Sequence, residues 1–171
     1  MKTRHIAMIG AAAAAALYLC VNFETTEEHY AAKENEKNTV GSVYLSVDCK
    51  TFLNTDKAKS YIDKGVIPSD GEIIKKTAYN ISEGDSAFTV LKTAVDKNRI
   101  IIDYDNVSGK SVYVKGISSV YEYDGGDLSG WMYSVNGEFP TVASSDYYLS
   151  DGDVVAWVYS CNLGKDVGDT F

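Results

Sequence analysis

A single helical pattern followed by four short strand-like runs constrains the fold of this chain more than any other feature. In the stretch SEGDSAFTVLKTAVDKNRI, Phe88, Leu91 and Val95 are spaced three and four residues apart, which puts them on one helical face. The following runs are rich in β-branched and aromatic residues and are separated by turn signals: RIIIDYD, SVYVKGISSVYEY, GWMYSVNG and DVVAWVYS. This order predicts an α+β domain, with a mixed or antiparallel sheet of about five or six short strands packed on one main helix.

Other elements are predicted from local patterns. In VGSVYLSVDCK, the alternating Val43, Leu45 and Val47 indicate a strand. EIIKKTAYNIS is predicted to be a second strand, and a short helix that stops at Gly65 is predicted between the two. The last run, DVVAWVYS, is apolar on both faces, which is typical of a central strand.

The N-terminal part of the chain is predicted to precede the domain. The basic stretch MKTRH and the apolar run after it indicate a signal peptide or N-terminal anchor at 1–21, and the anchor would be retained or lipid-linked. Residues 22–39 are predicted to form a polar tether, with a short exposed helix as the alternative, and the domain covers 40–171. We therefore expect a protein that is secreted or held at the extracellular face of the cell membrane or cell wall. Membrane contact is expected only through the N-terminal segment, if it is retained.

Charge and histidine content exclude several classes of function. The 171-residue chain has a formal net charge of −8, so nucleic acid is excluded as a partner. Its two histidines, His5 and His29, both precede the predicted domain, which excludes Ser-His-Asp and Cys-His catalysis and histidine-based zinc sites there. Acidic turns such as DGGD and DGD are interpreted as solvated turns rather than calcium ligands. We therefore expect no enzymatic activity, no catalytic residue and no metal site.

Four aromatic residues are the candidate ligand-binding residues. If SSVYEYD and SGWMYSV form a hairpin, Tyr123 lies opposite Trp131. Tyr121 then lies opposite Tyr133, and all four rings share one face of the sheet. Two interpretations are open. The rings cover the main helix as part of the core, or they form an exposed aromatic shelf for a flat ligand or a partner.

Two cysteines lie at the ends of the first and last predicted strands. Cys20 belongs to the N-terminal segment, which leaves Cys49 and Cys161 in the domain. In an exported protein such a pair favours a disulfide, which would close a loop of about 110 residues and contribute about 4 kcal/mol to stability. Two buried free thiols, which behave as small hydrophobic residues, are the alternative.

Four motifs in order, EGDSAFTVLKTA, SGWMYSVNG, YYLSDGDVVAWVYS and CNLGKDVGD, resemble the transcobalamin-like C-terminal domain family, formerly of uncharacterised function and common in exported proteins of Gram-positive bacteria. The resemblance covers about residues 40–171. It implies a β-grasp-like fold and a role in non-covalent binding, since the related domain of vitamin B12 carriers closes over the corrinoid. It also implies that Trp131 and Tyr133 lie on the conspicuous strand of such domains. The cysteine pair beside DCKT and SCNLG is similar to the bacterial pattern.

These features lead to two hypotheses about function. The first is an exported, non-enzymatic ligand-binding module, with cobalamin or another corrinoid as the bound small molecule and no other cofactor. Its tentative ligand-binding residues are Tyr121, Tyr123, Trp131 and Tyr133. The alternative is a structural or protein-interaction module of the bacterial cell surface, with a cell-surface protein as partner and the rings in the core. The exposure of Trp131 and Tyr133 distinguishes the two hypotheses.

Overall fold

The computed structural model describes residues 38–107, 109 and 111–169 of the chain. The compact unit that contains them begins at Thr39, where the first strand also begins. The predicted signal peptide or anchor and the greater part of the predicted tether lie outside the described residues. None of the helices in the described part is long and apolar enough to cross a membrane.

Four strands form the larger sheet, in the order β2-β1-β7-β6. They are β1 (Thr39–Asp48), β2 (Glu72–Ser82), β6 (Gly130–Val135) and β7 (Val154–Ser160). β1 and β7 run parallel, and each outer strand pairs antiparallel with its neighbour. The predicted strands VGSVYLSVDCK and EIIKKTAYNIS are confirmed, and DVVAWVYS is a central strand as predicted. Among the described strands β6 pairs only with β7, so β6 is an edge of this sheet.

Three strands form a second, smaller sheet, in the order β3-β4-β5. They are β3 (Ile102–Val107), β4 (Ser111–Ile117) and β5 (Val120–Tyr121). Ser118 and Ser119 both have positive φ angles, 51° and 60°, as in the two-residue turns that join hairpin strands. This turn reverses the chain at once, so that Val120 pairs with Ile117.

The main helix, α4 (Ala87–Lys97), follows β2 and begins with a capping box. Ser86 Oγ accepts a hydrogen bond from the Thr89 N–H (3.2 Å), and Thr89 Oγ1 accepts one from the Ser86 N–H (2.7 Å). The carboxylate of Asp85 accepts a hydrogen bond from the Ser82 N–H (2.8 Å) in the turn before the helix. The predicted helix is confirmed, and its N-cap is Ser86.

A short 3-10 helix and a short α-helix connect β1 to β2. They are η1 (Lys50–Asn54) and α3 (Ala58–Asp63). Gly65, with a φ of 68°, lies just beyond α3 and confirms the predicted stop. Phe52 of η1 is fully buried, and its ring lies edge-on against Tyr159 of β7, with 5.6 Å between the ring centroids. The connection therefore covers the end of the central strands.

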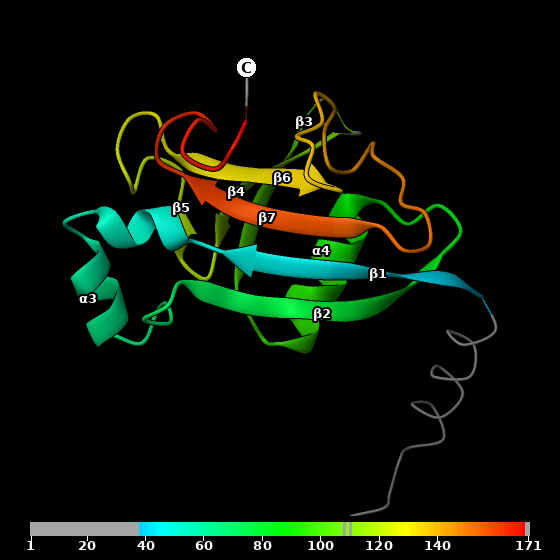
Figure 1. The fold of residues 1–171 in the computed structure, drawn as a ribbon, viewed down its shortest axis with the longest axis horizontal. Coiled ribbons are helices and arrows are strands. Elements are labelled where there is room, and N and C mark those ends of the chain that lie inside the picture. The colour runs from blue at the N-terminus through cyan, green and yellow to red at the C-terminus, as the bar shows by residue number, and fades with distance from the viewer. Residues whose placement is uncertain (1–37, 108, 110, 170–171) are drawn as a thin grey trace, which may run out of the picture. The chain divides into compact units, whose positions relative to one another are not determined.

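The core lies between the four-stranded sheet and the elements behind it in Figure 1, which are α4 and the three-stranded sheet. Leu45 of β1, Leu91 of α4 and Ile117 of β4 are fully buried in this single cluster. The α+β class is confirmed. The prediction of one sheet with about five or six strands is wrong, because the described residues form seven strands in two sheets. The run SVYVKGISSVYEY contains a hairpin turn of its own, which separates β4 from β5.

The predicted hairpin of SSVYEYD with SGWMYSV is wrong. Tyr121 pairs with Gly116 of β4, and a Cβ atom at Gly116 would lie only 2.7 Å from the Tyr121 ring. Because glycine leaves room for this ring, the short turn before Val120 can close on β4. The strand β6 pairs with β7 instead, with Trp131 opposite Tyr159 and Tyr133 opposite Trp157.

Candidate functional site

Trp131 and Tyr133 lie on the edge strand β6 and belong to the core cluster, with exposures of 7% and 9%. The Trp131 Nε1–H donates a hydrogen bond to the Val120 carbonyl of β5 (2.8 Å), and the Tyr133 hydroxyl donates one to the Val142 carbonyl (2.8 Å). Because both polar groups have partners, the rings can be buried at little cost. Core packing is therefore confirmed for these two rings, and an exposed shelf made of them is wrong.

The cross-strand aromatic pairs exist, but their partners come from β7. The rings of Trp131 and Tyr159 meet edge-on, and those of Tyr133 and Trp157 are stacked at 28°, each with 5.4 Å between centroids. Such pairs contribute about 0.5–1.5 kcal/mol beyond their buried area. Trp157 Nε1 is the one buried side-chain nitrogen or oxygen in the described residues without a hydrogen-bond partner. Packing rather than polar contact therefore holds this ring.

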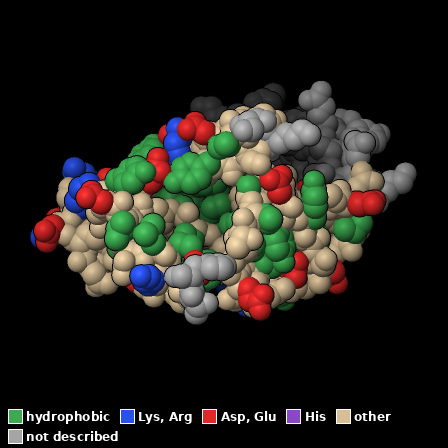
Figure 2. Space-filling view, turned by 90° about the horizontal axis from the view of Figure 1, so that it is seen from above, with side chains coloured by type: hydrophobic (Ala, Val, Ile, Leu, Met, Phe, Trp, Pro, Cys, Tyr) green, Lys and Arg blue, Asp and Glu red, His purple; other side chains and the backbone are tan. Residues whose placement is uncertain are grey.

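Two hollows lie along the free edge of β6, and we call them together the β6 groove. The loop hollow has a volume of about 340 Å³ and is lined chiefly by Tyr113, Tyr123, Leu128, Trp131 and Leu163. The hairpin hollow has a volume of about 330 Å³ and is lined chiefly by Val107, Val112, Tyr133, Val142 and Trp157. Tyr113 and Trp131 border both hollows, so the two hollows are neighbours on the surface. Seen from the β6 side, hydrophobic side chains gather around a hollow in the surface (Figure 2).

Exposed apolar side chains are concentrated at this groove. The described residues include eleven large hydrophobic side chains that are exposed, and six of them line the groove. These six are Val107, Tyr113, Tyr123, Leu128, Val142 and Leu163. Scattered exposed hydrophobic residues are normal, whereas a contiguous patch around a concave surface is typical of a binding site.

The charges at the groove are negative. Glu122 and Asp127 line the loop hollow, and no Lys, Arg or His is among the described residues that line either hollow. The Tyr113 hydroxyl donates a hydrogen bond to Glu122 Oε2 (2.6 Å), and burial together with this carboxylate raises the pKa of Tyr113 to about 12. In the described part of the chain, no group of three or more His, Cys, Asp or Glu side chains could hold a metal ion. The groove therefore offers neutral phenols, carboxylates and apolar surface.

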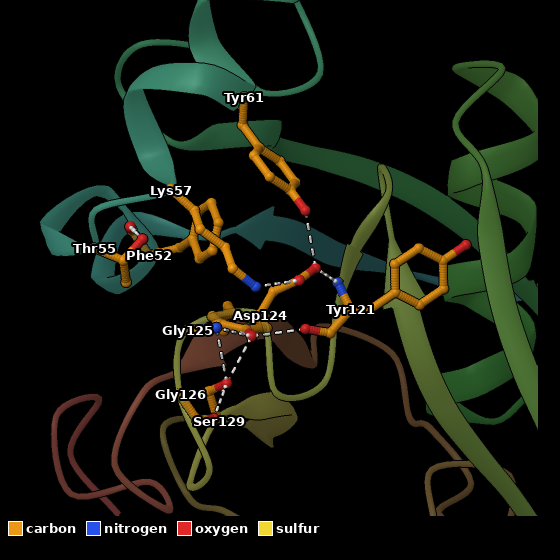
Figure 3. Close-up of polar contacts among 10 residues, drawn as sticks. Phe52, Thr55, Lys57, Tyr61, Tyr121, Asp124, Gly125, Gly126 and Ser129 are labelled. Carbon is orange, nitrogen blue, oxygen red and sulfur yellow. Dashed lines mark hydrogen bonds and ion pairs between the residues drawn. The ribbon is translucent and has the colours of Figure 1, made fainter.

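The loop between β5 and β6, which carries Tyr123, is anchored by Asp124 (Figure 3). The Asp124 carboxylate accepts hydrogen bonds from the Tyr121 N–H (2.9 Å), the Lys57 ammonium (3.0 Å) and the Tyr61 hydroxyl (3.1 Å). Burial opposes the ionisation of Asp124, but these three donors outweigh it and hold the pKa of the carboxyl below its usual range. These bonds hold the loop against Tyr61 of α3 and against Lys57, the residue before α3.

The hydroxyl of Tyr159 provides a second anchor for the same loop. It donates a hydrogen bond to the Tyr121 carbonyl (2.7 Å) and accepts one from the Gly125 N–H (3.0 Å). It also lies 2.8 Å from Ser129 Oγ. Because Tyr159 is fully buried in β7, these contacts connect the wall of the groove to the central sheet.

Replacing Asp124 by Asn is expected to lower the free energy of unfolding by about 2 kcal/mol at pH 7, because the ion pair with Lys57 is lost and one oxygen acceptor becomes an amide donor. A carboxyl whose folded-state pKa is depressed contributes stability above its unfolded pKa of about 4, and that contribution is lost as the pH falls through the folded pKa. The difference between the wild-type chain and Asp124→Asn should therefore shrink in acid. Urea unfolding at several pH values measures it.

Asp127→Asn is the matched control, since Asp127 lies in the same loop and its side chain forms no hydrogen bond or ion pair with the described residues. It should leave stability unchanged. A pH-independent deficit in Asp124→Asn would contradict the proposed role of the ionised carboxylate.

The two cysteines of the domain are free thiols in the structure. Cys49 is fully buried directly after β1, and burial, followed by the charge of Asp48, raises its pKa to about 12. Cys161 is half-buried after β7, and its Sγ lies 3.8 Å from Thr51 Oγ1, two residues beyond Cys49. The structure thus brings both thiols to the η1 end of the central strands.

Three of the four predicted aromatic residues border the groove, but not as predicted. Tyr123 forms an exposed wall, whereas Trp131 and Tyr133 form a buried floor. Tyr121 is partly exposed in β5, packs over Gly116 and does not line the groove. Further lining residues were not predicted, among them Tyr113, Leu128, Val142, Trp157 and Leu163. Of these, only Trp157 was marked by a sequence pattern, because it lies in DVVAWVYS, the strand predicted to be central from its two apolar faces.

Comparisons with known proteins agree with this architecture. Residues 84–160 match the family described as a domain of unknown function (DUF4430). Among solved structures, the chain is similar to haptocorrin in complex with Cbi, at 17% identity and a TM-score of 0.52. It is also similar to a Ruminococcus gnavus protein described as a candidate metal-binding protein, at 9% identity and a TM-score of 0.41 over 70% of this chain and 96% of that chain. None of the curated proteins matches the chain.

The likeness to haptocorrin covers 72% of this chain and 25% of the haptocorrin chain, so this chain corresponds to about a quarter of that protein. At this level of identity the likeness shows the fold alone. The family match spans α4 and the strands β3 to β7, which include the floor of the β6 groove and its walls except for Leu163. Residues 84–160 therefore match the DUF4430 family, and the fold of the domain that contains them is similar to that of haptocorrin.

Proposed function

We propose that this chain is an exported, non-enzymatic ligand-binding module and that the β6 groove is its binding site. The observation that carries the proposal is the concentration of exposed apolar side chains, since six of the eleven in the described residues line this one groove. Binding pockets are concave and mainly apolar, with a few polar groups that orient the ligand. In the loop hollow Glu122 and the Tyr113 hydroxyl are such groups.

Cobalamin or another corrinoid is the ligand that we favour. Two observations support it: the fold is shared with haptocorrin, whose structure holds Cbi, and the groove has two rings exposed at its wall, Tyr113 and Tyr123. Aromatic walls suit the edge of a flat macrocycle, because they bury a large area without ordering flexible side chains. The described residues around the groove include no histidine, so the binding would use contacts to the ring system rather than a ligand to cobalt.

Cyanocobalamin is expected to change the tryptophan fluorescence of the full-length chain in a saturable way. The chain has two tryptophans, Trp131 and Trp157, and both line the groove, so the signal reports on this site. Tyr123→Ala should weaken binding at least about fivefold, because exposed aromatic walls are frequent binding hot spots. Titrations followed by fluorescence, with correction for the absorbance of the corrinoid, measure the affinity.

The matched control is Tyr148→Ala, because Tyr148 is 68% exposed outside the groove and Tyr123 is 63% exposed within it. Tyr148→Ala should leave the affinity unchanged. No saturable change at high micromolar cyanocobalamin would overturn the corrinoid proposal, and equal effects of the two substitutions would overturn the groove as its site.

The edge position of β6 supports the alternative function, a structural or protein-interaction module of the cell surface. An edge strand presents unpaired backbone groups to which a partner strand can add, and here it lies beside an exposed apolar patch. The two functions give different results with small molecules. A protein-interaction module would show no saturable response to cyanocobalamin.

The β-grasp-like description of the fold is also part of this proposal. It is supported by the sheet order β2-β1-β7-β6, by the parallel central pair and by α4 packed behind the sheet. Export is supported by the position of the two domain cysteines at the same end of the sheet. A disulfide between Cys49 and Cys161 would be stable in the oxidising environment outside the cell, whereas disulfides are rare inside it.

A further inference from the structure

The loop hollow differs in chemistry from the rest of the groove. Three aromatic residues line it: Tyr113 of β4, Trp131 of β6 and Tyr123 in the loop between β5 and β6. Tyr113 and Tyr123 are 47% and 63% exposed, so a molecule in the hollow can reach both rings. The negative face of an aromatic ring attracts a cation that lies within about 6 Å of its centre.

Two carboxylates add to this attraction. Glu122 and Asp127 line the same hollow, and neither forms an ion pair with a Lys or Arg of the described residues. The hydrogen bond from the Tyr113 hydroxyl to Glu122 Oε2 fixes this carboxylate beside the Tyr113 ring. A positive charge in the hollow would therefore meet a carboxylate and an aromatic ring together.

Other tyrosines of the domain already have a cation at the ring. Lys76 Nζ lies 5.2 Å from the ring centre of Tyr44, and Lys97 Nζ lies 5.6 Å from that of Tyr79. Among the described residues, no lysine or arginine occupies the corresponding position over Tyr113, Tyr123 or Trp131. The loop hollow thus has aromatic rings and carboxylates but no lysine or arginine from the described part of the chain.

We propose that the loop hollow binds the alkylammonium group of an organic cation, such as a trimethylammonium group carried by the ligand. The inference rests on the proposed function of the groove as a binding site and adds the charge of what it binds. An alkylammonium group suits the hollow because its methyl groups contact apolar surface while its charge faces the rings and Glu122. Anionic ligands are disfavoured by the same two carboxylates.

Choline and its uncharged carbon isostere, 3,3-dimethylbutan-1-ol, test the proposal with the full-length chain. Both probes have the same shape, so any difference in affinity measures the charge. Choline is expected to bind about tenfold more tightly than the isostere, measured by tryptophan fluorescence at constant ionic strength. Equal affinities, or no saturable choline response, would overturn the ammonium site.

Glu122→Gln isolates the carboxylate, because the amide oxygen can still accept the hydrogen bond from Tyr113. It should weaken choline binding several-fold and leave the affinity for the isostere unchanged. Glu83→Gln, an exposed glutamate in the turn before α4, is the matched control and should change neither affinity. Loss of choline binding in Glu83→Gln as well as in Glu122→Gln would overturn the site, since it would indicate a general charge effect.

The choline and cyanocobalamin titrations separate the two proposals. Binding of cyanocobalamin without binding of choline overturns the ammonium site and leaves the ligand-binding function standing. Binding of choline without cyanocobalamin supports the ammonium site and overturns the corrinoid as ligand. If neither probe binds, both the ammonium site and the proposed groove function are overturned.

Discussion

Trp131→Ala is expected to lower the free energy of unfolding by about 3–5 kcal/mol, the range for removing a buried aromatic side chain. Three losses add up. The ring is almost fully buried between β6 and the elements behind it, its edge-on contact with Tyr159 disappears, and the Val120 carbonyl loses its hydrogen-bond donor. The substitution also removes the floor that both hollows of the β6 groove share, so ligand binding should be lost with it.

Urea unfolding followed by far-ultraviolet circular dichroism measures this effect without relying on the tryptophan itself. Trp131→Phe keeps a ring but removes the indole N–H, so it should cost less than Trp131→Ala. Because both variants lack the hydrogen bond to Val120, the difference between them measures the packing of the ring. Tyr148→Ala removes a ring that is 68% exposed and should cost little. A loss below about 1 kcal/mol in Trp131→Ala would show that Trp131 does not support the core.

A disulfide between Cys49 and Cys161 has the second largest expected effect, about 4 kcal/mol in favour of the oxidised chain in the chain-entropy model. The structure supports the pairing through location, because Thr51 of η1 contacts Cys161 and follows Cys49 by two residues. Oxidation removes one proton and one electron from each thiol, and an external oxidant such as oxidised glutathione takes up the two electrons. Burial keeps Cys49 protonated at neutral pH, since its pKa is raised to about 12, so oxidation should be slow once the chain has folded.

If the chain is exported as proposed, mass spectrometry of the alkylated protein after digestion without reductant should find one peptide pair joined through Cys49 and Cys161. Urea unfolding of the same chain before and after reduction then measures the stabilisation, with no substitution needed. Cys161→Ser provides the control, because its stability should not respond to reductant. Recovery of two alkylated domain thiols from the native exported protein would contradict the disulfide.

The elements that local periodicity defines were predicted well. The stripe of Phe88, Leu91 and Val95 predicted α4, and alternation in VGSVYLSVDCK predicted β1. The central position of β7 followed from its two apolar faces. These predictions depend only on the repeat of helix and strand and on the burial of apolar side chains, so they need no knowledge of the partner of each element.

The pairing of the aromatic strands was predicted wrongly, and the candidate site depended on it. Two aromatic strands separated by a glycine-rich loop suggested a hairpin, but the Ser118–Ser119 turn offered an earlier closure on β4. Neither serine is a residue that commonly marks a turn with positive φ, so the sequence carried little sign of it. Trp131 and Tyr133 consequently face β7 partners and the core, and the rings exposed at the groove are Tyr123 and Tyr113.

The sequence by itself determined the class of this protein: an α+β domain without the histidines that familiar catalytic sites require, with a central aromatic strand and motifs that resemble the transcobalamin-like family. Tertiary structure alone decided where the exposed apolar groove lies. The β6 groove is made of residues from β3, β4, β6, β7, two loops and the segment after β7, which are far apart in the chain. Local pattern reports whether a side chain is apolar, but only the packing of distant elements determines whether that side chain is covered. Trp131 and Tyr133 are therefore buried at the floor of the groove. Tyr113 and Leu163, which no sequence pattern singled out, form its exposed walls.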